Sequence, residues 1–427
     1  MLTKWKETFD TDESIEKINT YEYEPHHGTG LNESGTMIRI TIMNEDQFIL
    51  PSSSHLYFEG ELIPKTGNSN YDADECGISL VNNGLMYLFS SVEYRIANKK
   101  IEGYNNPGRA TTMKGLLTYP RVYPEGLGFM WGLDEKAKME ENDGFMKRCK
   151  YIHSEGNGKF SALIPLSHIF GFCENFDKVM YGSKHEITFH RKDDVDAIFR
   201  NNESVSEEDT SDKVRKGKLK LTKLSWKMPI IKLSDEAKVN LYTDIQNKVQ
   251  LPVEFLKRDC ESIQLNAGQK HMLWNLSFTT GKPRFVIVAF QKAKLDRDAA
   301  NSAVFDNLGV QNIRIEYNGE HYPEQDLNLD FKDNRYITAY HMLTDFFKRV
   351  MSKESCAVRV RDFKSHYSLF VFDISRQRER LKDTISDIII RANFDINIPQ
   401  NTHAYALILS DRELKLQSDG NRMHVLE

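Results

Sequence analysis

The chain has 427 residues, 40% hydrophobic and 28% charged, which excludes a disordered protein and allows two or three packed domains. A formal net charge of -5 excludes a polycation built to wrap nucleic acid. No apolar run approaches the ~20 residues of a membrane-spanning helix, and the first residues lack the apolar segment of a signal peptide. The aromatic content, with 24 Phe and 18 Tyr, favours β-structure.

The first part of the chain begins with a polar segment and continues as strands. Residues 1–36 are charged and show little periodicity, so we expect an N-terminal arm that is ordered against a partner. Apolar and polar residues then alternate through 37–43 and 48–64, which is typical of strands with one buried face. A loop rich in Gly, Asn and Asp follows at 65–77, and the pattern of 92–101 predicts a further pair of strands.

Residues 105–159 differ from their surroundings because Pro and Gly interrupt them and no strong strand pattern is present. We expect a surface insertion here, with a turn at 105–108 and a helix only at 134–150. Strands are predicted again at 160–166, 184–191 and 218–231, followed by a helix at 233–249 that is capped by Ser234 or Asp235.

The second part of the chain, from about Gln250, repeats this type of pattern. The apolar run 284–290 and the alternating segment 312–317, which is followed by an Asn-Gly turn, predict strands. Apolar residues at helical spacing predict a helix at 334–353, and 376–389 is interpreted as a short helix between strands. The last strand is expected at 403–410.

The two parts share an order of strands, which indicates duplication of one β-rich module. The alternating residues Val92, Tyr94 and Ile96 correspond to Ile313, Ile315 and Tyr317. Three later segments correspond in the same order: 160–166 to 367–374, 184–191 to 392–398, and 218–226 to 403–409.

The sequence signals for metal and phosphate sites are weak. His26 and His27 are adjacent, but no HExxH or Cys/His spacing supplies further ligands. The carboxylates of 72–76 lack the glycine and the distal Glu of a calcium loop. The Gly-containing segments 28–35 and 105–115 lack the GxxxxGK[ST] pattern of a phosphate loop. We interpret all of these as polar loops or turns.

Other reactive or charged residues also favour ordinary roles. The basic segment 376–380 could meet phosphate, but alternating charges are more typical of an exposed helix. Lys218, Lys220 and Lys223 lie on the polar face of one strand. The five cysteines are scattered without a CxxC pair, which predicts reduced thiols: Cys76, Cys149, Cys173, Cys260 and Cys356. The sequence therefore predicts no catalytic, cofactor-binding or metal-binding residues, no enzyme, and a structural or binding role.

Several segments, each short, carry a family resemblance when taken in order from about Tyr21 to the C-terminus. Over these segments the chain resembles the double jelly-roll major capsid (hexon) proteins of Polinton/Maverick elements and adintoviruses. The segments are YEPHHGTGLNESGTMIRITI, PSSSHLYFEGEL, IPLSHIFGF with YGSKHEITFHR, KPRFVIVAFQ, NSAVFDN, NIRIEYNGEHYP and YALILSDRELKLQSDG.

This resemblance implies an all-β fold of two tandem eight-stranded jelly-roll sandwiches with short helices and long loop insertions. Insertions at 102–159 and 320–365 would build an outward tower and grip neighbouring subunits. The implied divisions are an N-terminal arm at 1–36, a first jelly roll at 37–233, a linker helix at 234–249 and a second jelly roll at 250–427.

The resemblance also implies a function. The chain would be a structural major capsid protein that forms pseudo-hexameric homotrimers, the hexon-like capsomers of an icosahedral shell of a DNA virus or Polinton-type element. Its partners would be neighbouring capsomers and a penton protein, with weak contact to packaged DNA and no cofactor. It would be made in the host cytoplasm or nucleus and reside in the virion capsid.

Two other function classes compete with this one. The first is a cellular β-sandwich binding module, either a domesticated capsid-derived protein or a glycan-binding protein with a surface aromatic cluster. The second is an enzyme on a jelly-roll scaffold, such as a cupin-like metal oxygenase. It would need two His and a carboxylate on adjacent strands, and no such arrangement is evident in the sequence.

Overall fold

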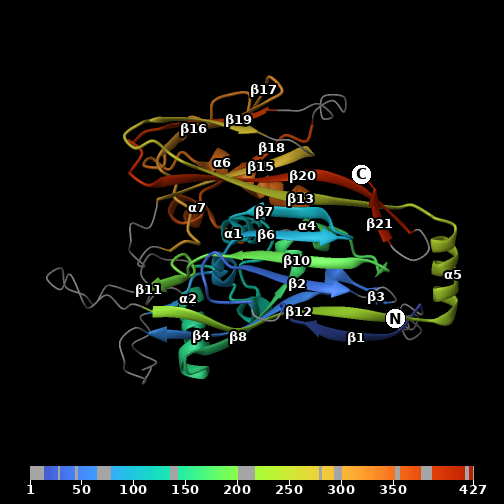
Figure 1. Ribbon diagram of the computed structural model, residues 1–427. Coiled ribbons are helices and arrows are strands. Elements are labelled where there is room, and N and C mark those ends of the chain that lie inside the picture. Colours follow the sequence, from blue (N-terminus) through green and yellow to red (C-terminus); the bar gives the residue numbers. More distant parts are fainter. Residues whose placement is uncertain are drawn as a thin grey trace, which may run out of the picture.

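The computed structural model contains two β-sandwiches, the first below the second in the view of Figure 1. Helix α5 (Asp235–Gln246) lies at one side and connects them. The structure describes residues 14–26, 29–43, 47–64, 78–134, 143–200, 217–277, 281–292, 301–351, 356–376, 387–418 and 423–426.

The first sandwich consists of two antiparallel sheets. One has the strand order β8-β4-β12-β3-β9, with β1 paired to β12, and the other has the order β2-β10-β6-β7. The short strands β5 and β11 pair separately. The bounds are β1 Ile15–Tyr23, β2 Met37–Met43, β3 Phe48–Ile49, β4 His55–Pro64, β5 Ile78–Leu80, β6 Phe89–Ile96, β7 Lys99–Asn105, β8 Lys159–Pro165, β9 Met180–Tyr181, β10 Lys184–Arg191, β11 Ile198–Arg200 and β12 Gly217–Leu233.

The second sandwich has the same plan. One sheet has the order β13-β20-β15-β18, with β21 paired to β20, and the other has the order β14-β19-β16-β17. The bounds are β13 Leu251–Gln264, β14 His271–Ser277, β15 Lys282–Lys292, β16 Val310–Tyr317, β17 Glu320–Tyr322, β18 Leu369–Asp373, β19 Asp387–Phe394, β20 Thr402–Ser418 and β21 Met423–Leu426.

The two sandwiches match strand for strand. In chain order, β1, β2, β4, β6, β7, β8, β10 and β12 occupy the places that β13 to β20 occupy in the second copy. Both copies bring the first, third, sixth and eighth strands into one sheet and the other four into the facing sheet. This confirms the predicted fold class, two tandem eight-stranded jelly-roll sandwiches, and it supports the predicted duplication.

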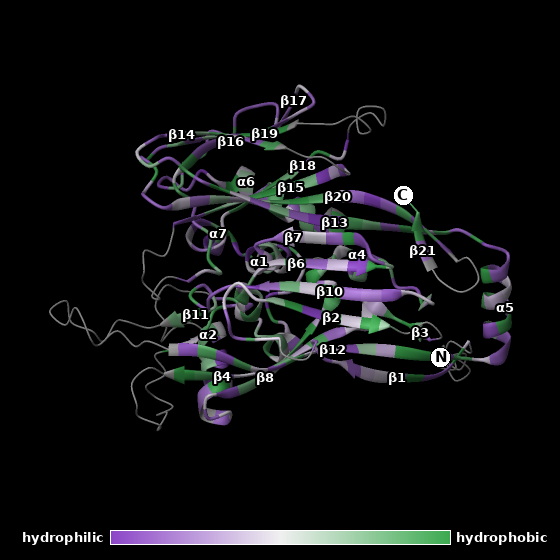
Figure 2. Ribbon diagram, viewed as in Figure 1, coloured by the Kyte–Doolittle hydropathy of each residue, from purple (hydrophilic) through white to green (hydrophobic). Residues whose placement is uncertain are grey.

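Alternation of side chains explains why these segments form facing sheets. In β2, Ile38, Ile40 and Ile42 are buried while Met37, Arg39 and Met43 are exposed. β15 and β18 are apolar along most of their length, and Figure 2 shows them largely in green. Burial of both faces explains why the run 285–290 in β15 is continuously apolar rather than alternating, while Arg284 before it is exposed.

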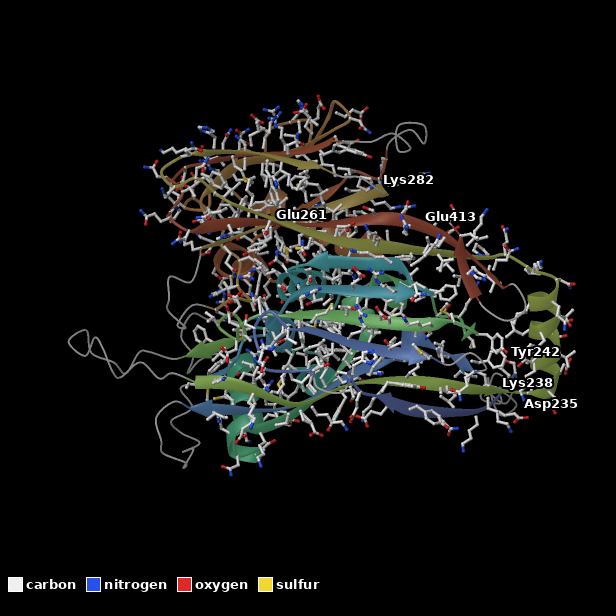
Figure 3. The ribbon with its side chains drawn as sticks, in the orientation of Figure 1. Asp235, Lys238, Tyr242, Glu261, Lys282 and Glu413 are labelled. Carbon is white, nitrogen blue, oxygen red and sulfur yellow. The ribbon has the colours of Figure 1, made fainter. Side chains whose placement is uncertain are left out.

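The helices cover ends and edges of the sandwiches. Ser234 caps α5, whose Asp235 and Lys238 lie on the outside of the molecule (Figure 3), so the predicted capped helix is confirmed. The predicted helix at 334–353 is confirmed as α6. The other bounds are η2 Pro51–Ser53, η4 Gly84–Leu88, α1 Pro107–Leu116, η5 Pro124–Phe129, α2 Asp143–Cys149, η7 Lys150–Glu155, α3 Leu166–Ile169, α4 Gly171–Asn175, α6 Ile337–Met351 and α7 Val360–Ser365. None of the helices within the described ranges has the length and apolar character needed to cross a membrane.

Two local predictions were wrong, and one is confirmed in part. The turn expected at 105–108 gives way to α1 at Pro107, because proline fits the first helical position, where no backbone N–H is needed. The helix expected at 134–150 is confirmed at Asp143–Cys149, and residues 135–142 lie outside the described part. The helix expected at 376–389 is wrong for its last three residues, which begin β19 and pair with β14. Residues 377–386 lie outside the described part.

The structure differs from two further expectations, one about the N-terminal arm and one about the cysteines. Residues 15–23, within the predicted N-terminal arm, form strand β1 because they pair with β12 of the same chain. Cys173, Cys260 and Cys356 are free thiols, as predicted, whereas Cys149 is disulfide-bonded. A lack of CxxC spacing therefore did not exclude a disulfide between cysteines that are distant in sequence.

Candidate functional site: the junction of the two sandwiches

The contact between the sandwiches, here called the junction, forms where β13 meets β7 and α4. β13 is an edge strand, since β20 is the only strand that pairs with it among the described residues. Its backbone N–H groups at Leu256 and Arg258 point away from β20 and donate to side chains of the first sandwich. Asn175 accepts from Leu256 at 2.9 Å, and Glu102 accepts from Arg258 at 2.9 Å. Side chains thus cover an open strand edge that would otherwise pair with another chain.

Glu102 is the buried acceptor at the centre of the junction. One oxygen also accepts from the N–H of Gly171 and the other from that of Phe172, both at 3.0 Å. Burial raises the pKa of Glu102, while Arg258 and these backbone donors act in the opposite direction. The carboxyl group therefore joins β7, α4 and β13 at one point.

The guanidinium group of Arg258 extends the junction to α3 and α4. It donates to the carbonyl oxygens of His168 at 2.5 Å and Ser167 at 2.9 Å, and it forms an ion pair with Glu174 at 2.7 Å. Lys114 contacts the other oxygen of Glu174 at 2.6 Å. Burial would raise the pKa of Glu174, but the two cations outweigh it and lower that pKa to about 2.

The junction is also closely packed. A Cβ atom added to Gly171 would lie 1.8 Å from the carbonyl oxygen of Leu256, so only glycine allows α4 to approach β13 this closely. Beside it, the rings of Phe172 and Phe255 meet edge to face with centroids 5.7 Å apart.

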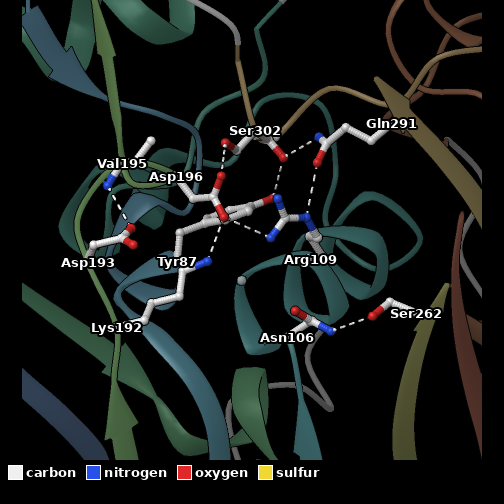
Figure 4. A network of polar contacts seen from close by, with 12 residues as sticks. Tyr87, Asn106, Arg109, Lys192, Asp193, Val195, Asp196, Ser262, Gln291 and Ser302 are labelled. Atoms are coloured by element: carbon white, nitrogen blue, oxygen red, sulfur yellow. Dashed lines mark hydrogen bonds and ion pairs between the residues drawn. The ribbon is translucent and has the colours of Figure 1, made fainter. Parts of the chain in front are cut away.

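A second polar network joins the sandwiches through α1 (Figure 4). Arg109 on α1 donates to Gln291 of β15 and to Asp196, both at 3.0 Å, and its guanidinium lies 4.8 Å from the ring centroid of Tyr405. Asp196 also accepts from Ser302 at 3.1 Å. Burial would raise the pKa of Asp196, but Arg109 and Lys192 lower it well below its usual range. The charge of Arg109 is therefore paired and desolvated at the same time.

Loops at one end of both sandwiches supply a third set of contacts. Asp134 in the first sandwich exchanges two hydrogen bonds with the hydroxyl of Tyr367, at 2.8 and 2.9 Å, and pairs with Arg148 at 2.7 Å. Arg121 pairs with Asp362 of α7 at 2.7 Å. These residues belong to the insertions predicted from the sequence or adjoin them.

The arrangement of these groups favours a role in holding the two sandwiches together over a role in a reaction. His168, the buried histidine on α3 at the junction, has its pKa lowered to about 3 by burial, and it packs among aromatic rings. No group of three His, Cys, Asp or Glu side chains that could hold a metal occurs among the described residues. The charged side chains named above are all engaged in the junction itself.

The weakly indicated site residues lie apart from the junction, with one exception. His26 is exposed, and its Nε2 atom lies 3.4 Å from the hydroxyl of Thr41. Asn32, in the segment 28–35, exchanges hydrogen bonds with the backbone of Leu221, so this segment anchors a loop. The exception is the segment 105–115, which supplies Arg109 to the polar network between the two sandwiches. His27, residues 72–76 and residues 377–380 lie outside the described part.

The lysines on the polar face of β12 have acidic neighbours. Lys223 pairs with Glu22 of β1 at 2.8 Å and approaches Glu24 at 3.7 Å. Sequence reasoning missed the residues that matter most, Glu102, Glu174 and Arg258. One signal was available: Arg258 interrupts the apolar pattern of its strand at a position that proves to be buried.

Comparison with known proteins agrees with this architecture. The family model described as the double jelly roll-like domain matches residues 78–414. The chain belongs to the double jelly roll-like domain family. The match begins at β5 and ends within β20, so it includes the junction, most of the second sandwich and the part of the first sandwich that follows β4.

Solved structures show the same fold at low sequence identity. A chain of the Sputnik virophage matches with a TM-score of 0.63 and 7% identity, over 98% of this chain and 90% of that one. PBCV-1 VP54 matches with a TM-score of 0.54 and 10% identity, over 99% of each chain. The mavirus major capsid protein matches with a TM-score of 0.52 and 10% identity, over 98% of this chain and 92% of that one. This double jelly roll chain therefore shares its whole architecture with them.

One curated relative matches over a shorter stretch. An uncharacterised protein of Caenorhabditis elegans is 24% identical over 159 residues, which is 35% of this chain and 38% of that protein. The match thus spans well under two thirds of the relative's length.

The close approach at Gly171 yields a first prediction. Gly171→Ala places a methyl group against a backbone oxygen that cannot move without displacing β13, and we expect a loss of about 2 kcal/mol or more in unfolding free energy. Gly128→Ala is the matched control, since nothing lies within 4 Å of its added Cβ. Urea unfolding of both variants measures the difference, and equal stability would contradict the tight junction.

The ion pairs of Glu174 yield a second prediction with a defined pH dependence. Because its pKa is lowered from 4.5 to about 2, the stabilisation from its carboxylate is complete above pH 4.5 and is lost as pH falls toward 2. Glu174→Gln should lower the unfolding free energy by about 2 kcal/mol at pH 7 and by progressively less below pH 4.5.

Melting curves of wild type and variant between pH 7 and pH 3.5 give this comparison. Glu413→Gln changes an exposed carboxylate on β20 and serves as the control. A gap between wild type and Glu174→Gln that stays constant over this pH range would show that the ion pairs do not stabilise the junction.

Proposed function

We propose that this chain is a structural major capsid protein that assembles into pseudo-hexameric homotrimers, the hexon-like capsomers of an icosahedral shell. The observation that carries the proposal is the double jelly roll architecture itself, which a viral major capsid protein shares over 98% of this chain. On this proposal the chain is a building block and not an enzyme, and it resides in the virion capsid.

The way the two sandwiches are joined supports such an assembly. The first sandwich contributes β7 and α4 to the junction, while the second contributes β13, so the contact is head to tail. A head-to-tail contact can be repeated, and it closes into a ring when the rotation allows. Two sandwiches per chain and three chains per ring provide six similar positions around one axis.

The insertions are proposed to form the outward tower and to grip neighbouring subunits. The ion pair between Arg121 and Asp362 supports this, because it ties the insertion at 102–159 to the one at 320–365 within one chain. Equivalent loop contacts between chains would strengthen a trimer in the same way.

Further parts of the proposal follow the sequence resemblance. The shell is that of a Polinton/Maverick element or an adintovirus, with neighbouring capsomers and a penton protein as partners, weak contact with packaged DNA, and synthesis in the host cytoplasm or nucleus. The proposed divisions are an arm at 1–36, a first jelly roll at 37–233, a linker helix at 234–249 and a second jelly roll at 250–427.

A second candidate function is favoured by one observation. The partial match to a Caenorhabditis elegans protein favours a domesticated, capsid-derived protein encoded in an animal genome. Such a protein would serve as a cellular binding module. It would keep the fold without an obligation to build shells.

The mass of the purified protein in solution tests the proposal. A homotrimer of 49.5 kDa chains has a mass of about 149 kDa, and light scattering coupled to size exclusion should report this value across dilution. A mass near 49.5 kDa at every concentration would overturn the capsomer assignment and leave the binding module as the better account.

A further inference from the structure

The internal repeat identifies a surface of the first sandwich that corresponds to the covered edge of β13. In the second sandwich, Asp411 on β20 pairs with Lys282, the first residue of β15, and the next residue, Arg412, pairs with Phe255 of β13. In the first sandwich, Lys227 on β12 pairs with His55, the first residue of β4, and the next residue, Met228, pairs with Tyr21 of β1. Tyr21 and Phe255 therefore hold equivalent places.

These two equivalent aromatic residues differ in exposure. Phe255 is only 5% exposed, because Phe172 of the first sandwich packs against it. Tyr21 is 49% exposed, and Ile18, three residues earlier in the strand, is 54% exposed. Among the described residues only β12 pairs with β1, so its outer edge is open where that of β13 is covered.

The second sandwich has a cavity at the place that corresponds to the covering surface. In the first sandwich, α3 and α4 follow the end of β8, where Pro165 pairs with His55 at the start of β4. In the second sandwich, Asp373 at the end of β18 pairs with Phe285 near the start of β15. A cavity of about 210 Å³ opens at this pair, and apolar side chains of α6, β15, β17 and β18 line most of it: Phe285, Tyr322, Met342, Phe346 and Phe372.

One chain cannot bring these two surfaces together. In Figure 1, β1 lies along the lower border of the molecule and β17 at the upper border, with the junction between them. An exposed aromatic on one border and an apolar cavity on the other can meet only between two copies. Asp345 and Asp373 line the same cavity, so a tyrosine that enters it also finds carboxylate acceptors for its hydroxyl.

We propose that Tyr21 of one copy inserts into the cavity formed by α6, β15, β17 and β18 of a second copy. This contact between chains would correspond to the packing of Phe255 against Phe172 within one chain. The proposal rests on the proposed homotrimer and names the surfaces that join its subunits.

Photo-cross-linking of the full-length protein tests the contact directly. The photoreactive residue p-benzoylphenylalanine replaces Tyr21, and ¹⁴N-labelled and ¹⁵N-labelled chains are mixed, unfolded and refolded together before irradiation. Mixed-isotope products that join position 21 to peptides containing 337–351 or 369–373 are expected. A trimer whose cross-links lie elsewhere, or only within one chain, would overturn the proposal and leave the capsomer assignment intact. A monomer would overturn both.

Substitutions supply an independent measurement of the same contact. Tyr21→Ala should raise the concentration at which the oligomer half-dissociates by ~10-fold or more, while Tyr21→Phe keeps the ring and should have a smaller effect. Val239→Ser on α5, which is 64% exposed, is the matched surface control and should leave dissociation unchanged. The melting temperature of each variant shows whether it folds, and a folded Tyr21→Ala variant that dissociates like wild type contradicts the proposal.

Discussion

An open strand edge is the constraint on which the rest of this structure depends. β13 begins the second sandwich, and within the described part of the chain no strand pairs with one of its edges. Such an edge attracts other chains unless something covers it. The first sandwich covers it with the side chains of Glu102 and Asn175, which accept its outward N–H groups. The placement of one sandwich against the other follows from this requirement, because both acceptors must reach alternate residues of one strand.

The junction is polar where a core would be apolar, and this has a physical consequence. Desolvating Arg258 and Glu174 opposes their attraction, so the pair contributes little net stability compared with an apolar replacement. Removing one partner, however, leaves a buried charge without compensation. A junction of this kind therefore favours one placement of the two sandwiches relative to each other.

Much of the fold could be predicted from the sequence, because the alternation of apolar and polar residues indicates strands even though the two halves of the chain share little sequence similarity. The alternation in 37–43 and 312–317, and the common order of later strands, were enough to predict two similar β-rich modules, and the family resemblance implied that each is a sandwich. The helix α1 was missed because its start, Asn106-Pro107-Gly108, is also a turn signal, and tertiary packing decides between the two. The strand at 387–389 was assigned to a helix because alternating charges precede it.

The candidate site was far less predictable. Glu102 and Arg258 are 156 residues apart, and neither lies in a motif, so only the folded chain shows that they meet. Gly171 illustrates the same limit, since its need to be glycine comes from a carbonyl oxygen 85 residues later in the chain. Tyr21 could be recognised only after the pairing of β1 with β12 placed it opposite Met228, in the position equivalent to that of Phe255.

The central claim is that one chain already contains, at its junction, the contact by which copies of the chain join. A three-dimensional reconstruction of the purified particle by electron microscopy tests this most directly. The account predicts six sandwiches around one axis, with the arrangement of β13 on β7 and α4 reproduced between chains by β1 on β17 and α6. A two-fold dimer, or a ring in which β1 faces solvent, would contradict it.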